Sequence, residues 1–258
     1  MPKGFDRRKY AGGSAVVVVS LILVSACLSE AQAQRFRQYY EPTPNGPLDS
    51  EFFFVRLQYS SSTRSRGRSS WLTDWPDAEM HLLPGITRLT RVATGPDGRI
   101  VSLLNDELMD YPWLYAVEVG QWYLDDLEAV RLREYLDRGG FLMVDDFWGP
   151  YEWSIFTESM RKVFPDRPIV ELGEDHPLLH VLYDLDQRTQ IPGRSGQRGE
   201  TPHWRGIFDD EDRLMVAINF NMDMGDAREH ADDPWYPEPM TALAYRFAVN
   251  YVIYSMTH

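Results

Sequence analysis

Two adjacent carboxylates, Asp145 and Asp146, follow an apolar run at residues 141–144 and a preceding pair of glycines. An unbroken apolar run bounded by glycine is typical of a strand that is buried on both faces of a parallel sheet. Ligands of open α/β sheets bind beyond the carboxyl ends of such strands, so the acidic pair stands where a site is expected. Successive strand residues point to opposite faces, and both carboxylates can enter one pocket only if the strand has already ended.

The chemistry expected of this pair is that of a metal ligand or a general base, which makes Asp145 and Asp146 candidate catalytic residues. The alternative is structural, with one carboxylate capping the following loop or helix and the other pairing with an arginine. Trp148 and Trp153 lie just beyond the pair. Their rings suit a sugar or an aromatic ligand, and the alternative is that they pack over the end of the sheet.

Histidines four residues apart share one face of a helix and can bind a metal ion. His176 and His180 have this spacing, and His176 is also a candidate catalytic residue. Pro177 suits the first turn of such a helix, so the alternative is that His176 or Asp175 caps it. No acidic residue lies between the two histidines, as a zinc-protease helix requires, and no metal is expected as a cofactor.

Polar residues near the ends of other predicted strands are expected at the same crevice. Arg56 and Tyr59 lie near the carboxyl end of the first strand and are ligand-binding candidates. A charged residue inside such a strand needs a partner, so we expect Asp145 or Asp146 to pair with Arg56, with anion binding as the alternative.

Asn219, Asn221 and Asp223 follow a later strand and place oxygen atoms at alternate positions. This pattern faintly resembles a calcium loop, but no Glu completes the twelve-residue pattern. We expect Asn219 and Asp223 to line the crevice as ligand-binding residues. The segment 193–196 has the spacing of neither a nucleophile elbow nor a phosphate loop, and a flexible loop is expected there.

Alternating strands and helices must position these residues. Apolar runs and period-two patterns predict strands, while capping signals and a period near 3.6 predict helices. The expected strands cover residues 51–59, 100–104, 113–119, 141–144, 169–172 and 213–219, and the expected helices start at the N-caps Asp74 and Asp125, at Ser154 and at Met240. Residues 188–202 are expected to form a polar surface excursion. This order favours one three-layer, doubly wound α/β domain at residues 51–258 with a mostly parallel sheet.

Residues 1–33 have the features of an export signal, namely a basic start, a short apolar run and a small-residue cleavage site at Ala31-Gln32-Ala33. The sequence before Cys27 also resembles a lipoprotein box, which makes Cys27 a lipidation candidate, and an uncleaved anchor is the third alternative. Residues 34–50 contain three prolines and are expected to form a tether. We therefore expect a periplasmic or otherwise exported protein that contacts the membrane only through its N-terminus.

Composition excludes several classes of function. The formal net charge is -13, and such a surface repels phosphate backbones, so nucleic-acid binding is not expected. Cys27 is the only cysteine of the chain. Residues 51–258 therefore have no disulfide, no thiol nucleophile and no cysteine-ligated metal.

Several short motifs occur together in an order that resembles a known family. They are the strand at residues 53–59, Trp75-Pro76, Tyr111-Pro112-Trp113-Leu114-Tyr115, the run 138–146, Phe164-Pro165, Asp175-His176-Pro177 and the run 250–254. Over residues 51–256 the chain resembles the bacterial domain-of-unknown-function family 4159. That family is similar to the class I glutamine-amidotransferase-like superfamily, which implies a flavodoxin-like fold.

The resemblance does not carry amidotransferase activity, because that activity needs a cysteine nucleophile that the domain lacks. Residues 117–121 also lack the His of a turn that is frequent in the family. We therefore expect a non-catalytic domain that binds a small-molecule ligand or an envelope protein. The alternatives are a hydrolase that uses Asp145 or Asp146, with or without a metal, and a structural member of an envelope assembly.

Overall fold

A computed structural model describes residues 50–61, 70–185, 188–194 and 200–258 of the chain. The export segment predicted at residues 1–33, Cys27 and nearly all of the predicted tether lie outside these residues. Within the described ranges, no helix has both the length and the apolar character that crossing a membrane requires.

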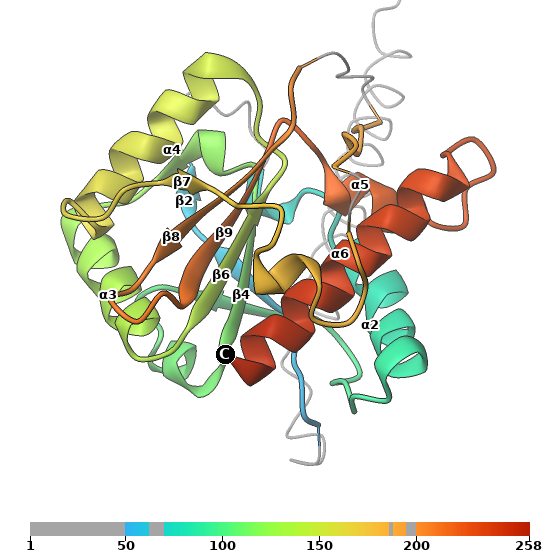
Figure 1. Ribbon diagram of the computed structural model, residues 1–258. Coiled ribbons are helices and arrows are strands. Elements are labelled where there is room, and N and C mark those ends of the chain that lie inside the picture. Colours follow the sequence, from blue (N-terminus) through green and yellow to red (C-terminus); the bar gives the residue numbers. More distant parts are fainter. Residues whose placement is uncertain (1–49, 62–69, 186–187, 195–199) are drawn as a thin grey trace, which may run out of the picture. The chain divides into compact units, whose positions relative to one another are not determined.

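The described residues form an α/β domain around a mostly parallel sheet of seven strands, in the order β3-β1-β4-β6-β9-β8-β7 (Figure 1). The strands are β1 (Val55–Gln58), β3 (Arg99–Ser102), β4 (Trp113–Val117), β6 (Phe141–Asp145), β7 (Val170–Glu171), β8 (His203–Phe208) and β9 (Leu214–Phe220). In this sheet order, the first five strands, β3-β1-β4-β6-β9, pair in parallel. Strand β8 pairs antiparallel with β9, and β7 pairs antiparallel with β8 at the edge. A small antiparallel sheet joins β2 (Ser60–Ser61) to β5 (Trp122–Tyr123).

Five α-helices accompany the sheet in the part of the chain that the structure describes. They are α2 (Asp77–Thr90), α3 (Asp126–Asp137), α4 (Gly149–Val163), α5 (Met224–Glu229) and α6 (Glu238–Thr257). Helix α3 packs on α4, whereas α2, α5 and α6 pack on one another. In Figure 1, α3 and α4 lie to the left of the sheet and α2 and α6 to its right.

Burial explains why the central strands carry apolar runs. Every residue of β4, β6 and β9 is buried, as expected for strands that are covered on both faces. The rings of Trp113 on β4 and Phe141 on β6 stack with their centroids 5.3 Å apart. Asp145 is the last residue of β6, so the strand ends between the two carboxylates of the acidic pair.

The strands expected near residues 100, 113, 141, 170 and 214 are confirmed, with bounds that differ by at most two residues. The strand expected at residues 51–59 is shorter, since β1 begins only at Val55. The predicted capping box of α3 is also confirmed. The Glu128 backbone N–H donates to Asp125 Oδ1 at 2.8 Å, and the Asp125 backbone N–H donates to Glu128 Oε2 at 3.0 Å.

Two predicted helix starts are wrong. Helix α4 begins at Gly149 rather than Ser154, because Pro150 occupies its first turn, where the missing N–H costs nothing. Helix α2 begins at Asp77, and Asp74 does not cap it; Asp74 is buried with a positive φ of 63°. Strand β8 and helix α5 were not expected at all.

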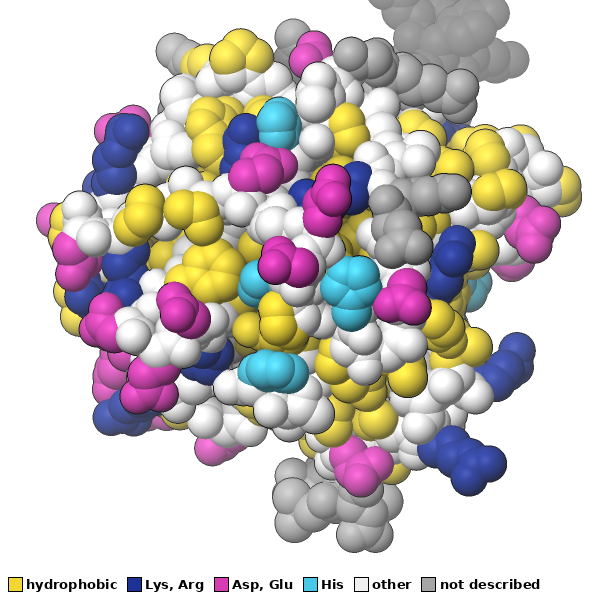
Figure 2. Space-filling model, in the orientation of Figure 1, with side chains coloured by type: hydrophobic (Ala, Val, Ile, Leu, Met, Phe, Trp, Pro, Cys, Tyr) yellow, Lys and Arg dark blue, Asp and Glu magenta, His cyan; other side chains and the backbone are white. Residues whose placement is uncertain are grey.

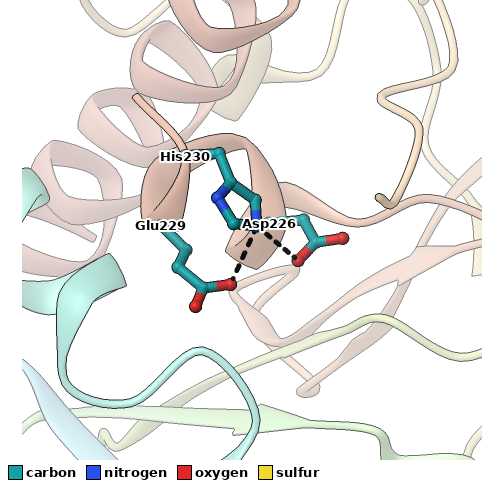
Figure 3. A group of neighbouring side chains, drawn as sticks. All are labelled: Asp226, Glu229 and His230. Atoms are coloured by element: carbon teal, nitrogen blue, oxygen red, sulfur yellow. Dashed lines mark ion pairs between the residues drawn. The ribbon is translucent and has the colours of Figure 1, made fainter. Parts of the chain in front are cut away.

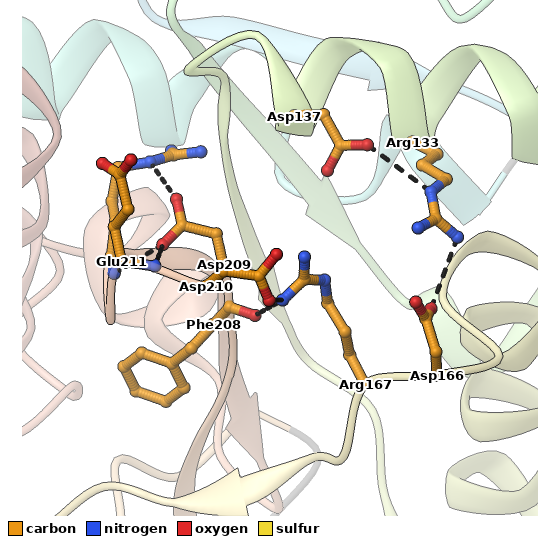
Figure 4. Close-up of polar contacts among 9 residues, drawn as sticks. Arg133, Asp137, Asp166, Arg167, Phe208, Asp209, Asp210 and Glu211 are labelled. Carbon is orange, nitrogen blue, oxygen red and sulfur yellow. Dashed lines mark hydrogen bonds and ion pairs between the residues drawn. The ribbon is translucent and has the colours of Figure 1, made fainter.

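Ion pairs and hydrogen bonds hold the turn between β8 and β9, and Figure 4 shows the contacts around Asp209 and Asp210. Asp209 Oδ1 accepts the backbone N–H groups of Glu211 and Arg213, both at 2.9 Å, and Asp209 Oδ2 accepts from Arg213 Nε at 2.9 Å. Arg213 also donates to the carbonyl oxygens of Leu136 and Gly140. Asp209 therefore orients the arginine that links the hairpin to the helix.

Replacing Asp209 by Ala should lower the free energy of unfolding by about 1–3 kcal/mol at pH 7, because charged hydrogen bonds are lost. Partial burial acts to raise the pKa of Asp209, but hydrogen bonds from the backbone of Arg213 and Glu211 outweigh it, so the pKa is lowered. The stabilisation is thus present above the unfolded-state pKa of about 3.9 and is lost as the pH falls through the lower folded-state value. Urea unfolding between pH 7 and pH 3 measures this, with Glu211→Ala as the control. Equal losses in both variants would contradict it.

The predicted pairing of Arg56 with Asp145 or Asp146 is wrong. Arg56 on β1 pairs with Glu79 on α2, with Nη2 and Nε of Arg56 at 2.5 and 2.8 Å from Glu79 Oε1, and neither side chain is exposed. Its Nη1 donates to the carbonyl oxygens of Trp71 and Thr73. The physical reason is that β4 lies between β1 and β6 in the sheet. Arg56 therefore has a structural partner on the neighbouring helix.

Replacing Arg56 by Met should destabilise the fold by about 3–5 kcal/mol, because Glu79 would remain as an uncompensated buried charge. The double variant Arg56→Met/Glu79→Leu should recover much of this loss, since it buries no charge. Chemical unfolding of both proteins is the measurement. A double variant that is less stable than Arg56→Met would refute this account.

Candidate functional site

A crevice of about 460 Å³ opens at the carboxyl ends of the central strands. Its lining residues are Thr73, Glu118, Gln121, Asp146, Trp148, Glu152, Arg194, Asp223 and Asp226. Strands β3 and β4 lie on opposite sides of β1, so the direction of strand addition reverses there. A reversal of this kind is where open α/β sheets bind ligands, and most of the lining residues follow β4, β6 and β9.

The crevice is strongly acidic. Five of its lining side chains are carboxylates, and Arg194 is the one Lys or Arg among the described lining residues. On the face of the molecule shown in Figure 2, acidic side chains are scattered among Lys, Arg, His and hydrophobic ones. The crevice therefore concentrates negative charge and favours a cationic ligand.

Three carboxylates form the densest part of this charge. One oxygen atom each of Asp74, Asp223 and Asp226 lies within 4.8 Å of the other two. Asp223 caps α5, because its Oδ1 accepts the backbone N–H of Asp226 at 2.7 Å. Asp226 Oδ2 accepts the backbone N–H of Arg194. We call Asp74, Asp223 and Asp226 the aspartate cluster.

Asp74 is the most unusual member of the aspartate cluster. Its relative exposure is 8%, and its Oδ2 has no hydrogen-bond partner among the residues that the structure describes. Gly225 allows this position, because a Cβ atom there would overlap Asp74 Oδ2. A buried carboxylate oxygen without a partner is costly unless a ligand supplies the missing interaction.

Burial and like charges raise the pKa values of carboxylates in the crevice and of Asp74 beside it. For Asp74 the larger cause is burial and the next is Asp226. Burial raises the pKa of Asp146, and the charges of Asp74 and Glu118 raise it further. Asp223 follows the same pattern, with burial first and Asp146 second. A bound cation would offset both causes.

The acidic pair divides between two environments. Asp145 is fully buried, and its Oδ2 accepts from Tyr115 Oη at 3.2 Å and from the backbone N–H groups of Met224 and Gly225 at 2.9 and 3.1 Å. Burial raises the pKa of Asp145 to about 6. Asp146 lies past the strand with a φ of 51° and lines the crevice. Asp145 therefore joins β6 to the start of α5, and Asp146 faces the ligand space.

The tryptophan candidates also separate. Trp148 lines the crevice, and its Nε1 donates to Asp146 Oδ1 at 2.7 Å. The ring of Trp153 stacks on Phe147 with the centroids 6.1 Å apart and packs at a tilt against Phe220 at 4.8 Å, and it does not line the crevice. Only Trp148 is placed to contact a ligand there.

Two other side chains that were expected to bind a ligand, those of Tyr59 and Asn219, instead donate hydrogen bonds to backbone carbonyl oxygens. Tyr59 Oη donates to the carbonyl oxygens of Val117 and Glu118 at 2.7 and 3.0 Å. The buried Asn219 donates to the Val144 carbonyl oxygen and accepts from Tyr251 Oη at 2.5 Å. Arg56, Tyr59 and Asn219 are therefore not among the residues that line the crevice, whereas Asp223 is.

The residues of the faint calcium-loop pattern do not form a separate loop, because Asn219 lies in β9 and Asp223 caps α5. Asn221 Oδ1 accepts the Gly149 backbone N–H, and its Nδ2 donates to the Thr201 carbonyl oxygen.

The surface excursion predicted at residues 188–202 is wrong in part. Ile191 is fully buried, and its carbonyl oxygen accepts the Asp223 backbone N–H at 2.9 Å, which brings the neighbouring Arg194 to the crevice.

His176 and His180 do not share the face of an α-helix. A three-residue 3₁₀ turn, Pro177–Leu179, separates them, and His176 caps it by accepting the Leu178 backbone N–H at 3.2 Å. His180 contacts Asp184 Oδ1 and the Glu174 carbonyl oxygen. The capping alternative is the one observed for His176, and neither histidine lines the crevice.

Sequence reasoning missed several residues of this region, among them Asp74, Glu118, Glu152 and Asp226. Glu118 and Glu152 carried no pattern that could have marked them. Asp226 did carry one, because Asp226, Glu229 and His230 are spaced for one face of a helix.

Comparisons with known proteins place the chain in a family. The family model described as Domain of unknown function (DUF4159) matches residues 53–256, a range that contains every strand of the large sheet. A search of curated proteins finds no match. Because the family model matches most of the chain, the chain belongs to the DUF4159 family.

Proposed function

We propose that this domain is a non-catalytic ligand-binding domain of the cell envelope, and that its ligand is a divalent cation held by the aspartate cluster. Two observations at Asp74 carry the proposal. Its buried Oδ2 has no hydrogen-bond partner within the described residues, and the residue belongs to a group of three carboxylates. A cation at this point would satisfy that oxygen and neutralise the crowded charge.

Calcium suits this cluster better than softer metals. Hard cations prefer carboxylate oxygens, and Ca²⁺ binds them at about 2.3–2.6 Å. Two oxygens on opposite sides of one Ca²⁺ ion then lie about 5 Å apart, which accommodates oxygens within 4.8 Å of one another. The crevice leaves room for water or for further oxygens from Asp146 or Thr73.

The proposal also covers the detailed type of fold and the cellular location of the protein. We infer a three-layer, flavodoxin-like arrangement of the glutamine-amidotransferase-like kind, supported by the order β3-β1-β4-β6 and by the two groups of helices. Export rests on the signal-like residues 1–33, and Cys27 or an uncleaved segment would provide an anchor. Binding of an envelope protein is tested by co-purification from an envelope extract.

A second candidate function is hydrolysis, which one observation favours. Asp146, Glu118 and Glu152 line the same crevice as the aspartate cluster, and burial raises the pKa of each of the three. Carboxylates with raised pKa values suit general acid–base work, and a bound cation could activate water beside them. In this function Asp146 replaces Asp145 as the candidate base, since Asp145 does not line the crevice.

Calcium should stabilise the wild-type protein, by about 2.7 kcal/mol at a concentration 100 times the Kd. Asp74→Asn and Asp223→Asn should abolish this stabilisation while leaving the cation-free protein at least as stable, because each removes a repelling charge. Thermal unfolding with and without Ca²⁺, together with calorimetric titration, measures both effects. Asp97→Asn is the matched control, since Asp97 is exposed and does not line the crevice. If all three variants respond to Ca²⁺ like the wild type, the proposal fails.

Asp145→Ala and Asp146→Asn should change stability in opposite directions at pH 7 without added cation. Asp145→Ala should cost about 1–3 kcal/mol, because three buried donors, Tyr115 Oη and the backbone N–H groups of Met224 and Gly225, lose their acceptor. Asp146→Asn should stabilise the protein, because the raised folded-state pKa of Asp146 makes its ionisation costly for the native state.

The gain from Asp146→Asn should disappear as the pH falls below the unfolded-state pKa of about 3.9, where the wild-type carboxyl is neutral in both states. Urea unfolding of both variants across this range is the measurement. A stability loss in Asp146→Asn equal to that in Asp145→Ala would contradict the division of the acidic pair.

A further inference from the structure

A second group of ligand-type side chains lies beside the aspartate cluster. Asp226, Glu229 and His230 point toward one another from α5 and the residue that follows it (Figure 3). Each offers one ligand atom within 4.8 Å of the other two. His230 Nε2 lies 3.2 Å from Glu229 Oε2 and 3.8 Å from Asp226 Oδ1.

The position of the His230 ring is set by a separate carboxylate. His230 Nδ1 lies 2.7 Å from Asp233 Oδ2, and the rings of Trp235 and Tyr236 pack against the imidazole. Metal-binding histidines almost always donate their other ring N–H to such a partner. With the proton on Nδ1, the Nε2 lone pair is directed at the two carboxylates of the group.

His230 Nε2 is buried and lacks a normal hydrogen bond. The residue is 7% exposed, and within the described residues this atom lies at ion-pair distance from Glu229 and Asp226 but makes no hydrogen bond. A nitrogen lone pair facing anionic oxygens in a buried position is unfavourable unless a cation lies between them. A proton that turns His230 into an imidazolium would meet this need, and so would a metal ion.

The distances and the donor types favour a metal ion. In a tetrahedral zinc site, ligand atoms about 2.0–2.1 Å from the metal lie about 3.4 Å apart. The observed separations of 3.2 and 3.8 Å are close to this value. Imidazole nitrogen together with carboxylate oxygen suits Zn²⁺ and its neighbours in the transition series, whereas Ca²⁺ takes oxygen alone.

We propose that Asp226, Glu229 and His230 bind a transition-metal ion of the Zn²⁺ type, with Asp233 positioning the imidazole. Asp226 belongs to both this group and the aspartate cluster, so one carboxylate is shared between two neighbouring cation sites. Only this sharing rests on the proposed function. The Zn²⁺ site itself stands on His230 and its two carboxylates.

The test uses the full chain, stripped with a chelator and titrated with Zn²⁺ by calorimetry and with Co²⁺ by visible absorption. We expect Asp233→Asn to weaken Zn²⁺ binding by about 10–100-fold. His230→Gln should weaken it further and remove the Co²⁺ bands. Glu229→Gln covers the case in which His230→Gln does not fold, because Glu229 is partly exposed. His203→Gln, a histidine on β8, is the matched control and should bind like the wild type.

Unchanged Zn²⁺ affinity and Co²⁺ bands in His230→Gln and Glu229→Gln would overturn the proposal. A wild-type protein that binds no Zn²⁺ would overturn it too, and would leave a protonated His230 as the explanation. The two sites can fail separately. Asp74→Asn should abolish Ca²⁺ binding and keep Zn²⁺ binding, and His230→Gln should do the reverse. If Asp226→Asn removes Zn²⁺ but Ca²⁺ never binds, the aspartate cluster fails and the Zn²⁺ site stands.

Discussion

The carboxyl end of the central sheet is dominated by carboxylates that are taken out of water and that also repel one another. Asp74, Asp146 and Asp223 each have a pKa raised by burial and by their neighbours. Arg194 is the one arginine or lysine within the described lining of the crevice, and the buried Arg56 and Arg228 oppose the rise in the pKa of Asp74 without cancelling it. A fold that keeps such a group without hydrogen bonds to all its oxygens loses stability, so a bound cation gives the arrangement a physical reason.

One short helix connects the elements of this arrangement. The backbone N–H groups at the start of α5 donate to Asp145 at the end of β6, which fixes the helix against the sheet. Asp223 caps the same helix, and Gly225 lets it approach Asp74 closely. His230 follows its last residue. The aspartate cluster and the proposed Zn²⁺ site therefore depend on the same contact between β6 and α5, and a change at Asp145 should disturb both.

The fold class and the place of the crevice could be predicted because both follow from local patterns. The apolar run before Asp145 marks a central strand, and parallel strands present their carboxyl ends at one edge. The partner of Arg56 could not be predicted, because it depends on which helix packs over β1. Strand β8 could not be predicted because Arg205 and Gly206 interrupt its apolar pattern. Helix α5 could not be predicted because it is too short to show a helical period. The role of Asp74 in the cluster could not be predicted, because only the tertiary fold places it beside α5.

The central claim is that the aspartate cluster holds a divalent cation. The most direct measurement is a crystal structure of the protein grown with Mn²⁺, an oxygen-preferring substitute for Ca²⁺ with a strong anomalous signal. The account predicts an anomalous peak bonded to Asp74 Oδ2 and to oxygens of Asp223 and Asp226. A structure without that peak, in which Asp74 Oδ2 instead accepts a hydrogen bond from the protein or from ordered water, would contradict it.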